Sequence, residues 1–310
     1  MKKCKHVVFS IYVCEQEVME LKYEKTRVSK TAQVNLMMLA DLGIEEAVHF
    51  QEVFSFSKGV LDVFSHIPMA SQLPQCISLI SEILYQRTNE IIMELDNPVV
   101  LDLACGYSPR AMKLCDNRHT YIGVDLPDVI TNLKEHRKEL NEKRTINEYY
   151  VVDLTKREEL IELTDRLKAP STVITQGLLT YLTLDQKQVL MENIMSLLQK
   201  DGGCWVIPDT SSSRLLPDIF SAVLGEGALS AYKQTMKIVD TYVKRNPSAN
   251  GWQTTDEIVE ALEKNGFRAE RVPLYTDTLE MVSTGRVSPE KAQKVIANWK
   301  DTESLIVYAK

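Results

Sequence analysis

The stretch Val99-Val-Leu-Asp-Leu103, followed by Ala104-Cys-Gly-Tyr-Ser-Pro-Arg110, decides how the whole chain is interpreted. An apolar run, a turn with glycine and an amphipathic segment are typical of a strand–loop–helix unit in a parallel sheet. Similar apolar runs recur along the chain, separated by amphipathic segments. We expect strands at 99–103, 121–124, 149–152, 172–175, 204–207, 267–272 and 305–309.

The segments between these strands carry the signals of helices. Thr183 and Gln186 form a capping box, and Thr254 with Glu257 begins a helix that stops at Gly266. Between the first five strands and just before the fifth, helices are expected near 109–115, 127–141, 156–167 and 185–199. Alternating strands and helices predict an α/β fold, with a doubly wound, seven-stranded, mostly parallel sheet of Rossmann-like type. We expect the seventh strand to follow a short connection and to be antiparallel.

The chain before the first strand is predicted to be helical. Ser29 or Thr31 begins a helix that stops near Gly43, and a second long helix ends before Pro98. The expected divisions are an N-terminal extension (1–28), a helical cap (29–97) and the sheet domain (98–310) with a helical insertion (211–250).

The overall charge argues against two classes of partner. The chain has 310 residues, with 36 Lys and Arg against 43 Asp and Glu, for a formal net charge of −7. Nucleic acids and anionic membrane surfaces attract clustered basic residues, which an acidic chain without a basic tract does not offer. We therefore expect neither partner.

The six cysteines show neither CxxC pairs nor zinc-finger spacing, so we expect no structural metal and reduced thiols. The basic start and the apolar run 7–14 superficially resemble a signal peptide, but Glu15, Glu17 and Glu20 follow immediately. A short strand or an extension is the favoured interpretation, and Met19 is an alternative start. We expect a soluble, cytoplasmic protein, because no apolar stretch is long enough to span a bilayer.

The turn after the first strand predicts a nucleoside site. Ligands of open parallel sheets bind beyond the carboxyl ends of the strands. Asp125 ends the second strand, where an acid can take both hydroxyls of a ribose, whereas Gly106 stands alone where a dinucleotide fingerprint has three glycines. The carboxylate of Asp102 would repel pyrophosphate and attract an ammonium group, and Pro109 removes a backbone donor. These features favour a nucleoside without phosphates.

The chain resembles the class I S-adenosylmethionine-dependent methyltransferases. More narrowly, it resembles the leucine carboxyl methyltransferase family, in its branch of bacterial polyketide-type O-methyltransferases. The resemblance covers about residues 29–310 and is strongest from 87 to 210. Its motifs are Val99–Arg110, Gly123-Val-Asp-Leu-Pro-Asp-Val-Ile130, Val152-Asp-Leu154, Ile174-Thr-Gln-Gly-Leu-Leu-Thr-Tyr-Leu182, and Gly251-Trp-Gln-Thr-Thr-Asp-Glu257 with Gly266-Phe267.

The resemblance implies S-adenosylmethionine as the methyl donor and a set of residues that hold it. These are Asp102, Ala104, Cys105 and Gly106 around its methionine part, Asp125 at the ribose diol with Leu126 beside it, and Asp153 and Leu154 facing the adenine. Asp125 and Asp153 also have a purely structural alternative, because an acid that ends a strand commonly caps the next helix.

Arg87 lies on the apolar stripe of the second predicted helix, together with Leu84 and Ile91. A buried arginine needs an anionic partner. The resemblance implies that this arginine takes the carboxylate of the cofactor. The alternative is an ion pair with a nearby Glu.

The chain departs from the family pattern at the end of the fourth strand. The family commonly has Glu there, and this chain has Gln176, which can accept or donate a hydrogen bond but carries no charge. Tyr181 is a candidate for the acceptor pocket or a packing residue. Arg110 is predicted either to steady the loop or to face the substrate.

The leading hypothesis is an S-adenosylmethionine-dependent O-methyltransferase that acts on a carboxylate or hydroxyl of a small molecule. The catalytic residues stay unassigned, and the lack of an obvious base mildly favours a carboxylate acceptor, which needs none. The alternatives are a protein carboxyl methyltransferase, a nicotinamide-dependent oxidoreductase and a non-catalytic cofactor-binding protein. The sequence predicts no oligomeric state.

Overall fold

The computed structural model describes residues 32–57, 69–114, 119–140, 146–210, 212–243, 252 and 254–310. The predicted N-terminal extension, the alternative start at Met19 and the helix starts at Ser29 and Thr31 lie outside these residues, as do Gly251 and Gln253.

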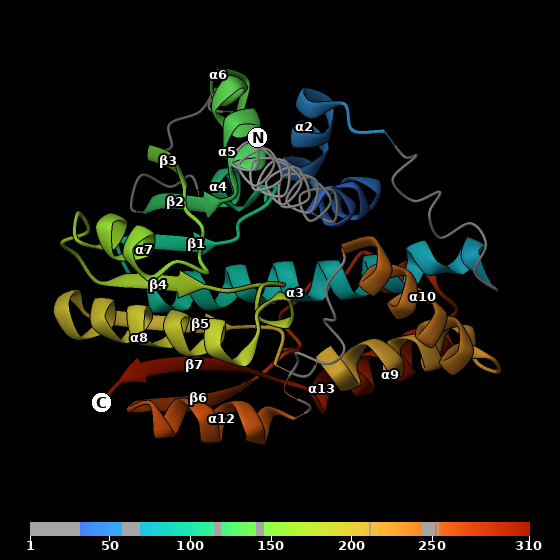
Figure 1. The fold of residues 1–310 in the computed structure, drawn as a ribbon. Helices are drawn as coiled ribbons and strands as arrows, with labels where there is room; N and C mark the ends of the chain where they lie inside the picture. Colours follow the sequence, from blue (N-terminus) through green and yellow to red (C-terminus); the bar gives the residue numbers. More distant parts are fainter. Residues whose placement is uncertain are drawn as a thin grey trace, which may run out of the picture.

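Seven strands form one sheet, in the spatial order β3-β2-β1-β4-β5-β7-β6 (Figure 1). Neighbouring strands run parallel except at β7, which is antiparallel to both β5 and β6. The strands are β1 (Val99–Leu103), β2 (Thr120–Asp125), β3 (Ile146–Val151), β4 (Ser171–Ile174), β5 (Gly203–Ile207), β6 (Phe267–Pro273) and β7 (Glu303–Ala309). The predicted seven-stranded, mostly parallel sheet with an antiparallel member is confirmed.

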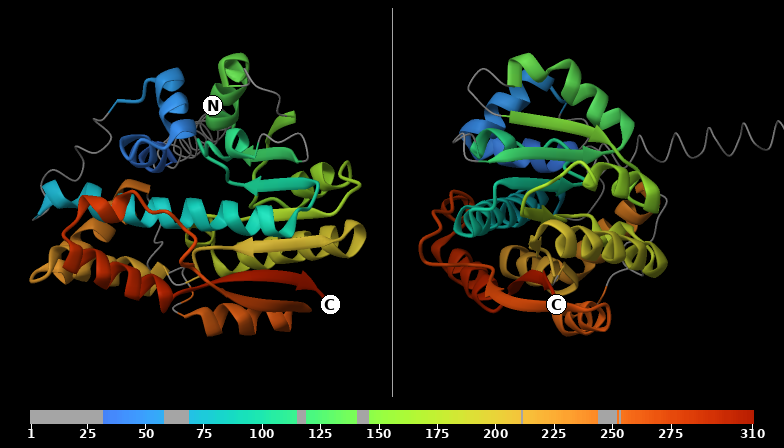
Figure 2. Two further views of the ribbon diagram at one scale, coloured as in Figure 1. Left: turned by 180° about the vertical axis from the view of Figure 1, so that it is seen from behind. Right: turned by 90° about the vertical axis from the view of Figure 1, so that its left-hand side faces the viewer.

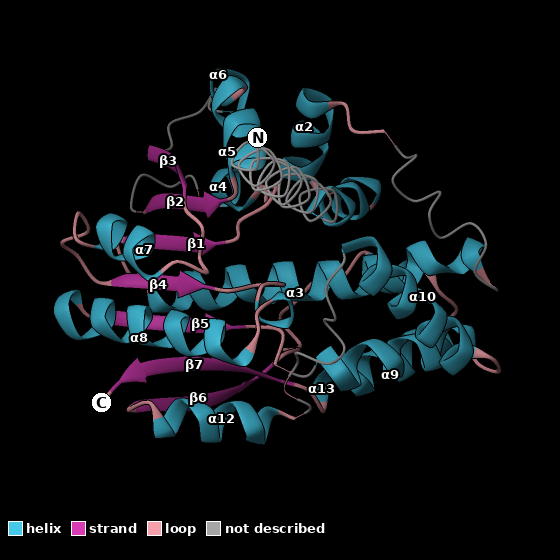
Figure 3. Cartoon of the chain, in the orientation of Figure 1, coloured by secondary structure: helices cyan, strands magenta, loops and turns pink. Residues whose placement is uncertain are grey.

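Helices cover both faces of this sheet (Figures 1 and 3). One face packs against α7 (Arg157–Thr164), α8 (Leu184–Asp201) and α12 (Thr255–Lys264). The opposite face packs against the helical residues 32–41, α2 (Glu45–Phe54), α3 (Leu73–Leu95), α4 (Arg110–Lys113), α5 (Pro127–Glu135) and α6 (Arg137–Leu140). Short 3-10 turns lie at η2 (Ala70–Gln72), η3 (Leu179–Tyr181) and η4 (Ser283–Arg286).

The alternation of side chains along β1 brings a charge into the interior of the protein. Successive residues of a strand point to opposite faces. Leu101 and Leu103 belong to the apolar core under α7 and α8, whereas Val100 belongs to the core under α3 and α5. Asp102 follows the parity of Val100 and is buried on that second side. This carboxylate therefore needs a partner from the helices that cover it.

A separate group of helices lies beyond the carboxyl ends of the parallel strands (Figures 1 and 2). It comprises α9 (Ser212–Leu224), α10 (Ala228–Val243) and α13 (Pro289–Lys300). These helices pack on the first half of α3 through a core that includes Leu79, Ile219 and Trp299. The helices α9 and α10 occupy the segment for which the sequence predicted a helical insertion.

The connection from β6 to β7 corrects one prediction. The sequence predicted a short connection, but residues 274–302 include the turn η4 and the helix α13. Ser288 caps this helix by accepting a hydrogen bond from the Lys291 N–H, and Pro289 occupies its first turn. The capping predictions at Thr183 and Thr254 are confirmed, because each side chain accepts the expected backbone hydrogen bond.

Candidate functional site

The loop after β1 makes a tight left-handed turn at the carboxyl edge of the sheet. Ala104 and Gly106 have φ angles of 59° and 55°. A side chain in this region is strained, so Ala104 stores strain at the place where the sequence predicts a binding loop. The Cys105 N–H donates to the carbonyl of Val124 (3.0 Å) and thereby ties the loop to β2.

Gly106 is required by its surroundings as well as by its backbone. A Cβ atom at this position would lie 2.8 Å from the Cβ of Ala32, which is closer than real Cβ contacts. The next residue, Tyr107, packs edge-on against the rings of Phe54 and Phe56. The loop is therefore held from outside by the helical residues 32–41 and by the end of α2.

Asp125 lies directly beside this loop. Its Oδ2 accepts a hydrogen bond from the Gly106 N–H and its Oδ1 accepts one from the Leu126 N–H, both at 2.7 Å. Burial raises the pKa of Asp125 to about 6, against the two backbone hydrogen bonds, which lower it. The helix-cap alternative is not what the structure has, because no side chain caps α5. A carboxylate has about four acceptor sites, so two are left for the hydroxyls of a ligand.

Arg110 is the centre of a buried polar network on the α3 side of the sheet. Its guanidinium pairs with Asp102 Oδ2 at 2.6 Å, and both side chains are about 2–3% exposed. Arg110 Nε donates to Asn89 Oδ1 (2.8 Å), and the Tyr121 hydroxyl donates to Asp102 Oδ2 (2.9 Å). The cation that Asp102 meets is therefore part of the protein. This finding corrects the expectation that its charge awaits the ammonium group of a ligand.

Gln176 belongs to the same network. Its Oε1 accepts a hydrogen bond from Arg110 NH2 at 2.8 Å. The side-chain oxygen that a glutamine has in common with a glutamate is thus bound by Arg110. Arg110 consequently steadies the loop, which is one of the two roles that the sequence left open.

One carboxylate of this edge was missed by sequence reasoning. Asp209 follows the end of β5, and its Oδ2 accepts a hydrogen bond from the Gly177 N–H at 2.9 Å. Burial raises the pKa of Asp209 to about 6. The signal was available in the sequence, since Asp209 follows the carboxyl end of its strand as Asp153 does.

The residues after β3 and β4 are placed as follows. Asp153 Oδ1 accepts from the Thr155 hydroxyl (2.6 Å) and from its N–H (3.2 Å), so this carboxylate shapes the turn before α7. Leu154 is buried among the core residues under α7 and α8. Tyr181 ends the turn η3 and is partly buried. Its predicted contact with an acceptor stays a prediction.

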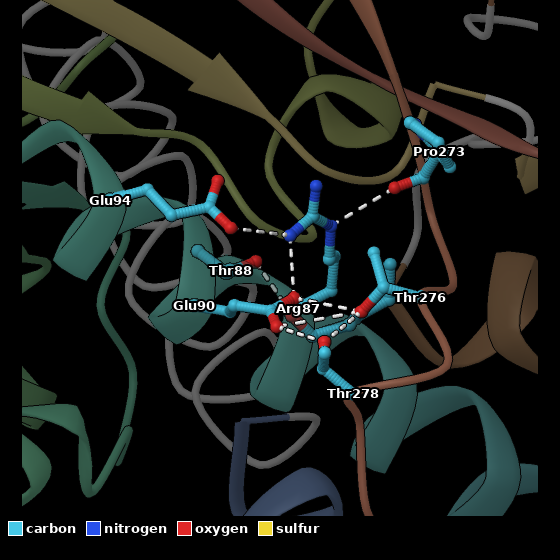
Figure 4. Close-up of polar contacts among 8 residues, drawn as sticks. Arg87, Thr88, Glu90, Glu94, Pro273, Thr276 and Thr278 are labelled. Carbon is cyan, nitrogen blue, oxygen red and sulfur yellow. Dashed lines mark hydrogen bonds and ion pairs between the residues drawn. The ribbon is translucent and has the colours of Figure 1, made fainter.

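Arg87 is buried but paired within the protein (Figure 4). Its NH1 lies 2.5 Å from Glu90 Oε2 and 3.4 Å from Glu94 Oε1, and its Nε donates to the carbonyl of Pro273 (3.0 Å). Thr276 and Thr278 also donate to Glu90. These hydrogen bonds and Arg87 lower the pKa of Glu90. The ion pair with a nearby Glu, which the sequence left open, is the arrangement observed.

We expect Arg87→Met to lower stability and to spare ligand binding. The substitution removes the hydrogen bond from the buried Arg87 guanidinium to the carbonyl of Pro273, which should cost about 1.5–3 kcal/mol of unfolding free energy in urea titrations. The affinity for S-adenosylhomocysteine in calorimetry should change less than twofold. Arg166→Met, at a 64% exposed side chain, is the matched control with little expected effect. Normal stability with weakened binding would show instead that Arg87 binds the cofactor.

A second pair of variants tests the role of Gln176. Gln176→Glu keeps an acceptor for Arg110, so the affinity for S-adenosylhomocysteine should change less than tenfold. Gln176→Leu leaves a buried guanidinium N–H without its acceptor and should cost about 1–3 kcal/mol of unfolding free energy. Calorimetry and urea titration measure both quantities. A larger loss of affinity in the Glu variant than in the Leu variant would show that this strand end faces an anionic group.

Among the described residues, no cluster of three or more His, Cys, Asp or Glu side chains is arranged to hold a metal ion. In the same part of the chain, none of the helices has the length and apolar character needed to cross a bilayer.

Comparison with known proteins gives only distant likenesses. No protein-family model matches the chain. No curated protein sequence matches it either. Among solved structures, an O-methyltransferase family protein from Burkholderia thailandensis is 14% identical with a TM-score of 0.43, and the match covers 80% of this chain and 61% of that protein. The chain thus spans less than two thirds of that protein.

Two other solved structures illustrate the range of these likenesses. Magnesium protoporphyrin IX methyltransferase from Synechocystis, solved with bound S-adenosylhomocysteine, is 12% identical (TM-score 0.40; 84% of this chain and 91% of that one covered). Human N-acetylserotonin methyltransferase, in complex with S-adenosylmethionine, is 14% identical (TM-score 0.40; 88% and 65% covered). At these identities and TM-scores, any assignment of function rests on the geometry of the site itself.

Proposed function

We propose that the protein is an S-adenosylmethionine-dependent methyltransferase that methylates an oxygen of a small molecule. The observation that carries this proposal is the position of Asp125. Its carboxylate lies 2.7 Å from the Gly106 N–H, where the strained loop after β1 meets the end of β2. An acid at this place suits the two hydroxyls of a ribose.

The surroundings of the loop favour a nucleoside without a pyrophosphate. The helix after the loop, α4, has only four residues, and Pro109 at its N-cap has no N–H to donate. A dinucleotide site would instead offer several glycines and the N-terminus of a longer helix. This argues against the nicotinamide-dependent oxidoreductase.

The residues present fit the bound donor in the following way. Asp125, with Leu126 beside it, would hold the ribose, and Asp153 and Leu154 would face the adenine. Ala104, Cys105 and Gly106 would contact the methionine part, and Asp102, whose charge Arg110 neutralises, would support the loop that they form. The bound donor supplies a methyl group on a sulfonium, which is an excellent leaving group. The protein's own task is to orient the acceptor and exclude water.

We also propose that the protein belongs to the leucine carboxyl methyltransferase family, in its polyketide-type branch. The motifs from Val99 to Leu182 support this membership. We assign residues 98–310 to the donor-binding domain and residues 29–97 to a cap, with α9 and α10 beyond the carboxyl ends of the strands as the source of acceptor specificity. We place the protein in the cytoplasm.

Ligand-dependent stability tests the proposal. S-adenosylhomocysteine at 100 times its Kd should raise the unfolding free energy by about 2.7 kcal/mol, while a nicotinamide dinucleotide should have no effect. Transfer of label from S-adenosylmethionine to a panel of acceptors then separates an enzyme from a non-catalytic binding protein. Stabilisation by the dinucleotide alone would overturn the proposal.

A further inference from the structure

Asp209 is held on a fixed piece of backbone at the carboxyl end of β5. On one side, the carbonyl of Pro208 accepts a hydrogen bond from the Ser304 hydroxyl (3.1 Å). On the other side, the Thr210 hydroxyl donates to the carbonyl of Glu303 (2.5 Å). Both partners belong to β7, so hydrogen bonds to this strand fix the backbone on either side of Asp209.

The two oxygens of Asp209 differ in their surroundings. Oδ2 accepts from the Gly177 N–H, whereas Oδ1 has lost its contact with solvent and has no hydrogen-bond partner among the described residues. A buried carboxylate oxygen without a partner is costly for the folded protein. Such unpartnered buried groups are typical of functional sites, where a ligand supplies the missing hydrogen bond.

A short chain of contacts connects Asp209 with the predicted donor loop. Gly177 directly follows Gln176, whose side chain accepts from Arg110. Arg110 in turn pairs with Asp102 at the end of β1. The carboxylate of Asp209 is therefore two strands away from the loop, on the same carboxyl edge and in one connected network.

We propose that Asp209 is the general base of the methyl transfer and that the acceptor is a neutral hydroxyl compound. This inference rests on the proposed function. A hydroxyl donates its proton to Oδ1, the oxygen without a hydrogen-bond partner among the described residues, and so satisfies it. A carboxylate acceptor would instead bring a second negative charge against a buried carboxylate. The structure thus reverses the mild preference for carboxyl methylation that the sequence alone gave.

The proposed reaction transfers one proton to Asp209 and one methyl group to the acceptor oxygen. The acceptor hydroxyl gives its proton to Oδ1 of Asp209 while its oxygen forms a bond to the methyl carbon. The bond between that carbon and sulfur breaks, and its electron pair stays on sulfur, which becomes a neutral thioether. Burial has already raised the pKa of Asp209 to about 6, so the carboxylate is ionised at neutral pH and is a better base than an exposed one.

The test compares Asp209→Asn with the wild type on a defined panel. The panel holds phenols and alkyl alcohols beside benzoic and fatty acids, and methylation is followed with labelled S-adenosylmethionine. Asparagine keeps an acceptor for the Gly177 N–H but offers no base. Asp301→Asn is the matched control, since Asp301 is exposed and ends α13.

We expect the wild type to methylate hydroxyl compounds of the panel and no carboxylic acids. Asp209→Asn should lower kcat at least about 100-fold, with the affinity for S-adenosylhomocysteine within twofold and the melting temperature not lowered. The Asp301→Asn protein should match the wild type in all three measurements.

Three results would overturn this inference while leaving the proposed function intact. They are methylation of the acids, absence of any methylated hydroxyl compound, and an Asp209→Asn variant that keeps its kcat. A tenfold loss of S-adenosylhomocysteine affinity in that variant would also overturn it, because Asp209 would then hold the donor. A wild type that does not bind S-adenosylhomocysteine would refute the proposed function instead.

Discussion

Replacing Arg110 by methionine is expected to lower the free energy of unfolding by about 3–5 kcal/mol. The guanidinium, which is 2% exposed, is the counter-ion of Asp102, so its removal leaves an uncompensated carboxylate in the core. Asn89 and Gln176 lose a donor at the same time. Urea titration measures the difference, and Arg214→Met, at a side chain that is 63% exposed, should change stability by less than about 0.5 kcal/mol.

A double variant separates the effect of the lost ion pair on stability from the effect of lost packing. The Arg110→Met, Asp102→Asn protein has lost both charges of this pair, so neither is left uncompensated and part of the lost stability should return. If Arg110→Met alone were as stable as the wild type, the pair would not stabilise the loop after β1, and Arg110 would not be the centre of the buried polar network.

Replacing Asp125 by alanine is expected to weaken the binding of S-adenosylhomocysteine by about tenfold to a hundredfold. Each charge-assisted hydrogen bond to a ribose hydroxyl contributes about 1.5–3 kcal/mol, and part of it is recovered by water. Calorimetry on the folded variant measures the loss. Asp128→Ala, at an exposed acid one turn further along, should keep wild-type affinity.

The same residue predicts how binding depends on pH. The pKa of Asp125 is raised to about 6 by burial and, to a smaller extent, by the charge of Asp102. Below this pH the carboxyl becomes protonated and accepts fewer hydrogen bonds, so the wild-type affinity should fall between pH 7.5 and pH 5. Because the pKa of Asp125 is higher in the folded protein than the ordinary value of Asp, its ionisation lowers the free energy of unfolding as the pH rises to about 6, and this cost persists above pH 6. An Asp125→Ala protein with unchanged affinity would exclude this residue from the site.

The strands were predictable because each reads as an apolar run between turn signals. The predicted bounds of β1 agree with the structure at both ends, and Thr183 and Thr254 begin the helices that their spacing predicted. The helix α13 was missed, although Ser288 and Pro289 are a typical helix start. Its polar composition leaves only a narrow apolar stripe, at Val295 and Trp299.

For the candidate site, the sequence could indicate only single residues at strand ends. Asp125 was selected in this way, because it ends the second predicted strand. The sequence could not say which buried arginine meets which acid, because that depends on how α3 lies against the sheet. Arg87 faces Glu90 and the end of β6, whereas Arg110 reaches across β1 to Gln176.

A structure of the protein crystallised with S-adenosylhomocysteine is the most direct test of the proposed site. We predict that both ribose hydroxyls lie within about 3.2 Å of the Asp125 carboxylate, with the homocysteine part along Ala104 to Gly106. The Arg110–Asp102 pair should be unchanged in that structure. A nucleoside bound elsewhere, or with its ribose away from Asp125, would contradict the account.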